Sequence, residues 1–313
     1  MDIRKHSRTN RLQSVMMILS LALILGVCGY LLLGWLGVWL ALGVALFILI
    51  STGKASAQLV LRMYRAQLIE PHQAPGLVNL FEALATRAQL PVIPKLYIVP
   101  SRMMNAFATG RGDQVAVAVT DGLLRNMDAR EIAGVLAHEI SHIKNDDVFT
   151  MTLADSISRV TAFIGQAGLF MLLAAIPSAI LGYGFPWLAG VVLLFAPSIS
   201  ALIQLALSRS REYDADETAA MLTGDPIGLA MALKKIEFSQ GNWLQKIFMP
   251  GRRVPEPAML RTHPPTQERI DKLKQMAGID PGMRLPVPDG LVAHFDGGRI
   301  IRPPRWHLTG LWY

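Results

Sequence analysis

The sequence is poor in cysteine and in charge. Cys28 is the only cysteine among 313 residues, and it lies inside an apolar run. A lone cysteine excludes an intramolecular disulfide framework and argues against a secreted disulfide scaffold. Charged residues make up 17% of the chain and hydrophobic residues 52%, with a mean hydropathy of +0.36, whereas a soluble domain has about 25% charged residues. This composition predicts a membrane protein.

Charge is missing altogether from two long stretches, the 42 residues 12–53 and the 49 residues 160–208. As helices they would be about 63 Å and about 73 Å long, roughly twice the ~30 Å thickness of the hydrocarbon layer. We therefore predict four transmembrane helices in two hairpins. The first hairpin has spans over 13–33 and 36–52, and the second turns at 182–186. Both stretches are too long for the apolar region of a signal peptide, which is about 7–15 residues.

The net charge of +7 indicates an anionic membrane surface as the partner and not nucleic acid, because basic residues flank the apolar stretches. They are Arg4, Lys5, Arg8, Arg11, Lys54, Arg62, Arg65, Lys144, Arg159, Arg209 and Arg211. Neither predicted turn carries a charge. The positive-inside rule then predicts that both termini and residues 53–159 are cytoplasmic, so the two polar segments can assemble into one domain.

The resulting organisation has five segments. They are an N-terminal transmembrane hairpin (1–53), a first cytoplasmic catalytic part (54–159), a second transmembrane hairpin (160–208), a second cytoplasmic catalytic part (209–277) and a Pro/Gly-rich tail (278–313) to which we assign no role. The fold class is a mostly α membrane protein with an α+β cytoplasmic domain that contains a small β-sheet. We expect helices over 55–69, 75–89, 128–145, 210–223, 226–239 and 265–277, a strand over 95–99 and a hairpin formed by 105–108 and 114–119.

The motif His138-Glu139-Ile140-Ser141-His142 lies inside the helix that Asp128 is expected to cap. Histidines at i and i+4 project from one face of a helix and are spaced to bind one metal ion. The intervening glutamate is placed to take a proton from a water molecule bound to that metal. The alternative is a surface helix that carries these residue types by chance.

A catalytic zinc ion needs three protein ligands and an open position for water. Glu212 is the best candidate for the third ligand. The histidines lie just before the third predicted span and Glu212 lies just after the fourth, so the hairpin returns Glu212 to the membrane level of the histidines. Asp216 lies one helical turn further on and could accept the second ring N–H of a ligating histidine. The alternative is that both are solvated acids beside a run of arginines.

Four pieces of the sequence together resemble the HtpX heat-shock membrane metalloproteases, which are relatives of the CAAX prenyl endoproteases. They are the segment 105–110, the motif 138–142, the segment 210–216 and the segment from Thr262-His263-Pro264-Pro265 to Arg269-Ile270. Their order, together with the hydrophobic hairpins, covers about residues 10–277. The resemblance does not extend to the tail.

The resemblance implies a gluzincin-like zinc endopeptidase of the bacterial inner membrane with a cytoplasmic active site. It would bind one zinc ion per chain and cleave misfolded or damaged membrane proteins or unfolded polypeptides in a stress response. His138, His142 and Glu212 would bind the zinc, Glu139 would be the general base and Asp216 the outer acid. Other membrane quality-control proteases are the further partners that it suggests.

The resemblance also implies roles for residues outside the central motif. His263 and Arg269 match positions thought to stabilise the oxyanion, although His263 could instead cap the next helix and Arg269 could be a surface residue. The strand of Asn105, Ala106, Phe107 and Ala108 matches the edge that pairs with substrate. Strand addition supplies the main-chain recognition that suits broad specificity.

Other classes of protein fit the sequence less well. In an intramembrane protease of the site-2 type, the motif lies inside a span, but here Asp128, Arg130, Glu131 and Lys144 put too much charge on the motif helix. A transporter would need charged or titratable residues such as Asp, Glu, Lys, Arg or His in its spans, which hold none of these. The main alternative from another class is a zinc-binding membrane chaperone or scaffold without proteolysis. Structural zinc sites, however, are closed by four ligands that are usually cysteine-rich.

Overall fold

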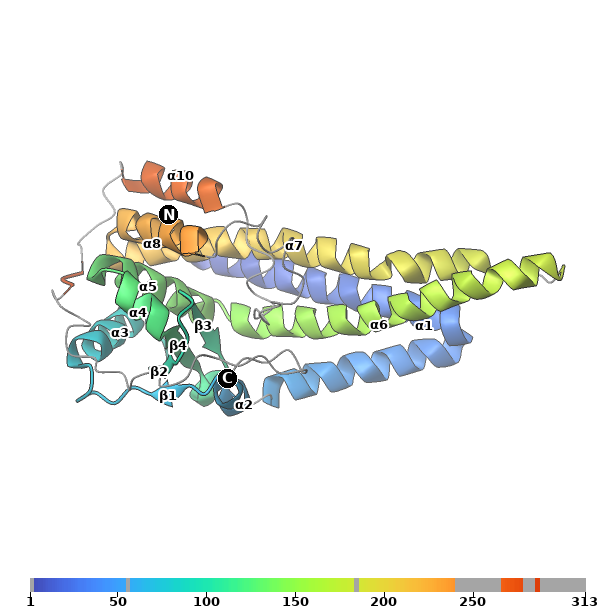
Figure 1. The fold of residues 1–313 in the computed structure, drawn as a ribbon, viewed down its shortest axis with the longest axis horizontal. Helices are drawn as coiled ribbons and strands as arrows, with labels where there is room; N and C mark the ends of the chain where they lie inside the picture. Colours follow the sequence, from blue (N-terminus) through green and yellow to red (C-terminus); the bar gives the residue numbers. More distant parts are fainter. Residues whose placement is uncertain (1–2, 55–56, 183–185, 240–265, 278–284, 288–313) are drawn as a thin grey trace. The chain divides into compact units, whose positions relative to one another are not determined.

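The structure is a computed structural model, and it describes residues 3–54, 57–182, 186–239, 266–277 and 285–287 (Figure 1). Their order along the chain is α1 (Ile3–Lys54), α2 (Ala57–Met63), β1 (Gln67–Leu68), α3 (Pro75–Arg87), β2 (Lys95–Val99), β3 (Ala106–Thr109), η1 (Gly112–Gln114), β4 (Ala116–Thr120), α4 (Asp121–Asn126), α5 (Ala129–Lys144), α6 (Asp147–Ile180), α7 (Trp187–Thr223), α8 (Pro226–Ser239) and α10 (Thr266–Ala277). These elements form two compact units. The first contains Met1–Lys54 and Phe149–Ser210, and the second contains Ala55–Val148 and Arg211–Tyr313.

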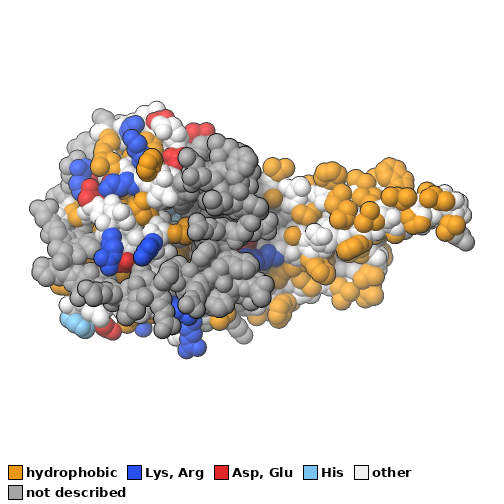
Figure 2. All heavy atoms as spheres, in the orientation of Figure 1, with side chains coloured by type: hydrophobic (Ala, Val, Ile, Leu, Met, Phe, Trp, Pro, Cys, Tyr) orange, Lys and Arg blue, Asp and Glu red, His pale blue; other side chains and the backbone are white. Residues whose placement is uncertain are grey.

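The first unit contains most of the apolar sequence. Three helices are long and apolar enough to cross a membrane, namely Leu12–Ser51 within α1, α6 and α7. Hydrophobic side chains cover much of the surface over these helices (Figure 2). The composition and these helices agree that the chain is a membrane protein.

The helix α1 contains an interruption where the sequence predicts a turn between two spans. Leu33 and Gly34 have non-helical backbone angles, and Gly34 has a φ of +60°, a value that glycine adopts readily. A Cβ atom on Gly29 would lie 2.3 Å from the carbonyl oxygen of Gly37, so the two backbones touch on either side of the interruption.

A four-stranded mixed sheet organises the second unit, with the strand order β1-β2-β4-β3. β2 and β4 are parallel, whereas β1 and β3 pair antiparallel with their neighbours. Strands β2, β3 and β4 and the helices α3 and α5 have the residues predicted for them, to within one or two positions. The sequence did not predict the short helix α4 or the strand β1. The expected helix over 55–69 is wrong beyond Met63, because Arg65 has a φ of +52° and Gln67 pairs with β2.

Side chains alternate between the two faces of this sheet, as the pleat of a strand requires. One face packs into the main core with α3, α5 and α8, and includes Leu96, Ile98, Ala108, Val117 and Val119. The other face packs against Ala57 and Leu61 of α2, and includes Val99, Phe107, Ala116 and Ala118. The sheet is therefore covered on both faces, and β3 forms one edge of it among the described residues.

The C-terminal part of the chain adds little described structure. The helix α10 contributes Ile270 and Leu273 to the main core. Within the tail, residues 285–287 are described, and the backbone N–H of Leu285 donates to the carbonyl of Thr223 over 2.9 Å. The segment that contains His263 lies outside the described residues.

Candidate metal centre and active site

The helix α5 positions the central motif, and its sequence explains why it forms. Asp128 is the N-cap, and its side chain and that of Glu131 make the reciprocal bonds of a capping box, which stabilise the first turn. Ile132, Leu136 and Ile140 recur at every fourth residue and are fully buried. This stripe fixes the rotation of the helix, so His138 and His142 lie on one side of it.

The two histidines point toward each other. Their Nε2 atoms are 3.2 Å apart and their ring centroids are 4.7 Å apart. Glu212 of α7 completes the group, with Oε2 3.4 Å from Nε2 of His138 and Oε1 3.5 Å from Nε2 of His142. One ligand atom from each of the three residues lies within 4.8 Å of the others, and all three side chains are buried.

The donor set fits zinc. Two imidazole nitrogens and one carboxylate oxygen are ligands that a catalytic zinc ion takes, with the fourth position left for water. The other ring nitrogen of each histidine is turned toward a carboxylate: Nδ1 of His138 is 3.0 Å from Asp216, and Nδ1 of His142 is 3.1 Å from Asp147. The Nε2 atoms are thus the ones available to a metal.

Asp147 is the partner that the sequence did not identify. It is completely buried and opens α6, three residues after the end of α5. The segment offers Asp146 and Asp147 side by side, and Asp146 instead pairs with Arg111 at the surface. Only the path of the chain between the two helices decides which of them faces His142.

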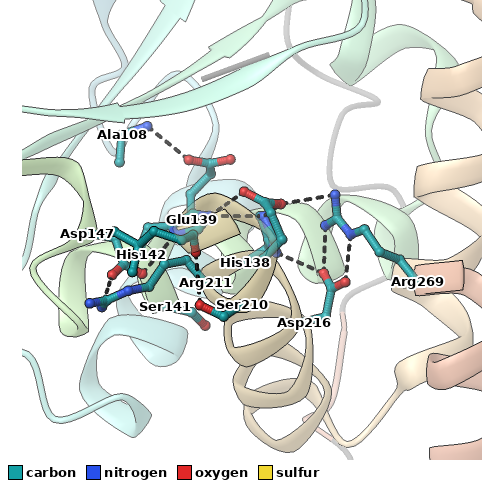
Figure 3. A network of polar contacts seen from close by, with 12 residues as sticks. Ala108, His138, Glu139, Ser141, His142, Asp147, Ser210, Arg211, Asp216 and Arg269 are labelled. Carbon is teal, nitrogen blue, oxygen red and sulfur yellow. Dashed lines mark hydrogen bonds and ion pairs between the residues drawn. The ribbon is translucent and has the colours of Figure 1, made fainter. Parts of the chain in front are cut away.

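The two aspartates that face the histidines, Asp147 and Asp216, are each held by an arginine (Figure 3). Arg269 of α10 donates from Nε and Nη2 to Asp216, both over 2.7 Å, and its Nη1 lies 3.0 Å from Glu212. Arg211 of α7 donates from Nη1 to Asp147, and its side chain is 1% exposed. Arg269 is therefore a buried residue and not a surface residue.

The carboxylate of Glu139 reaches the sheet (Figure 3). Its Oε2 accepts the backbone N–H of Ala108 in β3 over 2.9 Å. The base candidate of the motif therefore contacts the strand that the sequence analysis assigned to substrate.

The register of β3 shows which of its backbone groups face outward. The N–H of Thr120 donates to the carbonyl of Asn105, and the following pairs are Ala106 with Val119 and Ala108 with Val117. Because hydrogen-bonded and non-hydrogen-bonded pairs alternate in an antiparallel ladder, Ala106 and Ala108 direct their N–H and C=O groups away from β4. The bond from Ala108 to Glu139 agrees with this register.

The metal-free site shifts the pKa values of its titratable groups. Burial lowers the pKa of His138 and His142, but the carboxylates outweigh it: Asp216 and Glu212 raise the pKa of His138, and Asp147 and Glu212 raise that of His142 well above its usual value. Burial alone would raise the pKa of Asp216, yet the charge and hydrogen bonds of Arg269 lower it. The site is thus a buried network in which the carboxylates are paired with arginines and histidines.

Fold and site together define the class: a membrane protein with a buried His-His-Glu group and a glutamate between the histidines is a metalloprotease. The chain belongs to peptidase family M48, which matches residues 71–277. Zinc is the metal of this family, and the donor set fits it. The family and the site favour proteolysis, and nothing in them favours the non-proteolytic alternative.

Relatives of similar length support this assignment. A protein described as "Protease HtpX homolog" from Acaryochloris marina is 39% identical over 293 residues, which cover 85% of this chain and 94% of the relative. Homologs of the same description from Aquifex aeolicus and Pyrococcus abyssi are 41% identical over 259 residues (78% of this chain, 85% of the relative) and 40% identical over 283 residues (84% and 94%). The crystal structure of S. mikatae Ste24p shares the fold, with a TM-score of 0.50, 20% sequence identity and coverage of 85% of this chain and 65% of that one.

Proposed function

We propose that this membrane metalloprotease is an endopeptidase that binds zinc through His138, His142 and Glu212 and uses Glu139 as its general base. The observation that carries the proposal is the convergence of the three ligand atoms within 4.8 Å in a buried site. Zinc, when bound there, polarises the scissile carbonyl and brings the pKa of a bound water to about 7. Asp216 holds the ring of His138 through Nδ1.

Glu139 performs the proton transfers of this mechanism. Its carboxylate takes the proton of the attacking water and delivers it to the leaving amine, as a general base and then a general acid. The backbone N–H of Ala108 fixes the orientation of the carboxylate.

The edge strand β3 is the proposed binding site for substrate. The outward N–H and C=O groups of Ala106 and the outward C=O of Ala108 are placed to pair with an extended polypeptide, while Asn105 and Phe107 point their backbone groups toward β4. Main-chain pairing of this kind recognises any extended segment, which supports unfolded polypeptides and unfolded parts of membrane proteins as substrates.

His263 and Arg269 receive different roles in this proposal. His263 remains the candidate for stabilising the oxyanion, as the resemblance to the family implies, and it lies outside the described residues. Arg269 is bound to Asp216 and Glu212 through three of its nitrogen atoms. We therefore propose that Arg269 holds these carboxylates and does not contact the reacting carbonyl.

The membrane arrangement that we propose has four spans in two hairpins. The interruption at Leu33 and Gly34 and the close approach of Gly29 to Gly37 support a turn inside α1. Leu21 and Ile48, from the two halves of α1, belong to the same apolar cluster, which further supports an antiparallel pair. The positive-inside rule supports cytoplasmic termini and a cytoplasmic catalytic domain assembled from 54–159 and 209–277.

A bacterial inner-membrane location and a role in stress-related quality control complete the proposal. The support is the similarity to proteins described as HtpX protease homologs. Other membrane quality-control proteases are the partners that we propose on the same basis.

The test compares detergent-purified wild type with Glu139→Gln and Glu212→Ala. An unfolded model polypeptide serves as substrate, and zinc per chain is measured on the same samples. We expect Glu139→Gln to keep its zinc and lose about 10²–10⁴-fold in rate, because an amide still accepts the N–H of Ala108 but cannot act as a base. We expect Glu212→Ala to lose both zinc and activity.

Three outcomes would contradict the proposal. Cleavage at the wild-type rate by Glu139→Gln would remove Glu139 from the mechanism. Zinc retained by Glu212→Ala at one ion per chain would place the third ligand elsewhere. Zinc without cleavage in the wild type would favour a chaperone or scaffold role.

A further inference from the structure

The carboxylate of Asp147 has two partners, and both are buried. Oδ2 lies 3.1 Å from Nδ1 of His142, and Oδ1 accepts Nη1 of Arg211. The side chains of Asp147 and Arg211 are 0% and 1% exposed. The carboxylate is thus held from one side by an arginine while its other oxygen contacts a histidine of the metal-binding group.

The same arrangement occurs a second time in the site. Asp216 contacts Nδ1 of His138 with one oxygen, and both of its oxygens accept hydrogen bonds from Arg269. The two arginines come from different helices, α7 and α10. Each of the two histidines of the site therefore contacts an aspartate that is in turn held by an arginine. This repetition indicates that the two aspartates have the same role.

Stability by itself does not explain the pair of Asp147 and Arg211. Removing two charges from water has a large desolvation cost, and a well-packed apolar pair of similar volume is often equally stable or more so. The orientation of the histidine ring does explain it. If Nδ1 of His142 donates its proton to Asp147, the lone pair of Nε2 is directed to the metal.

We propose that Asp147 and Arg211 are positioning residues that orient the His142 ring for metal binding. Arg211 fixes Asp147, and Asp147 fixes the ring. The pair also joins the first residue of α6 to the part of α7 that carries Glu212, so it holds the second and third ligands in one geometry. This inference rests on the proposed function, because it assigns His142 to the metal.

The decisive variant replaces both charges together, as Asp147→Leu with Arg211→Met. It removes both members of the buried ion pair, so neither Asp147 nor Arg211 is left without its partner, and the metal-free protein is expected to unfold at about the wild-type temperature. His142 loses its acceptor, and we expect the dissociation constant for zinc to rise by about 10- to 100-fold. The visible spectrum of the cobalt-substituted protein is expected to change, because the imidazole no longer has one orientation.

Two single substitutions complete the set. Arg211→Lys keeps a positive charge beside Asp147 but loses the planar fork of donors, so its zinc affinity should lie between those of the wild type and the double variant. Arg130→Met is the matched control. It breaks the ion pair between Arg130 of α5 and Asp225, which also lies in the second unit, without touching a metal-binding residue, so zinc affinity and the cobalt spectrum should stay unchanged.

The measurements are the zinc dissociation constant by competition with a chromophoric chelator, the cobalt spectrum and the unfolding temperature of the metal-free proteins. Weaker metal binding with unchanged metal-free stability in the double variant supports a positioning role. Wild-type affinity and spectrum in the double variant would overturn it. If the double variant does not fold, Arg211→Lys decides, and wild-type affinity in that variant would also overturn the proposal.

Failure of the proposed function has a different signature. In that case His142→Ala would bind zinc as tightly as the wild type, whatever the variants at Asp147 and Arg211 show. If His142→Ala loses zinc while the Asp147 and Arg211 variants do not, the metal site stands and only the positioning role is wrong.

Discussion

Proline in place of Ala108 probes the contact between the edge strand and the base. The N–H of Ala108 faces away from β4 and donates to Glu139 over 2.9 Å. Proline removes this donor without removing any hydrogen bond of the ladder, and its fixed φ near −65° lies within the β region. An edge strand tolerates such a residue, so the sheet should remain folded.

The expected loss of activity follows from the geometry. The Cδ atom of proline takes the place of the amide hydrogen, so Oε2 of Glu139 must move away from its position 2.9 Å from the nitrogen. The lost bond to a charged acceptor is worth about 1.5–3 kcal/mol, or about 10- to 150-fold in rate. Complete displacement of the base would cost about 10²–10⁴-fold. We expect kcat/KM to fall by about 10²-fold.

The assay measures kcat and KM on an unfolded polypeptide, zinc per chain and the unfolding temperature. Ala106→Pro is the matched control, because its N–H also faces outward and lies in the same strand. That variant should lose at most one neutral hydrogen bond to substrate, about 0.5–1.5 kcal/mol or about 2- to 12-fold in kcat/KM. Zinc content should be one per chain in both variants, since neither residue is a ligand.

Two results would refute this reasoning. If Ala108→Pro has the activity of the wild type, Glu139 needs no donor from β3. If Ala106→Pro and Ala108→Pro lose activity equally, the loss comes from the strand and not from the contact with Glu139.

Two further predictions concern packing and pH. Gly134→Ala places a Cβ atom 2.8 Å from the Cα of Leu229 in α8. Overpacking costs about 1–3 kcal/mol and alanine regains at most about 1 kcal/mol of helix propensity, so the unfolding temperature should fall. Gly43→Ala is the control and should not lower it, because a Cβ atom there meets nothing within 4 Å. Because the pKa values of His138 and His142 are raised in the metal-free site, protons compete with the metal at a higher pH than for ordinary histidines, and zinc affinity should rise with pH through and above neutrality. A zinc affinity that does not change between about pH 6 and about pH 9, a range that extends upward from the usual histidine pKa, would contradict the prediction on pH.

The sequence was sufficient for those features that depend on local pattern. Asp128 as an N-cap predicted the start of the helix that carries the motif, because a cap acts within the first turn of its own helix. The spacing of His138 and His142 placed them on one face for the same reason. Glu212 could be proposed because the stretch 160–208 is long enough for two spans, which would bring the chain back to the side of the membrane on which the histidines lie.

The tertiary structure alone decided the contacts between segments far apart in the chain. Neither the choice of Asp147 over Asp146 nor the pairing with Arg211, 64 residues further on, has a local signal. The same holds for the bond from Ala108 to Glu139, which depends on the register of β3 against β4. These groups meet because burial of the apolar faces fixes how the elements pack, and a buried charge must then take whichever partner that packing provides.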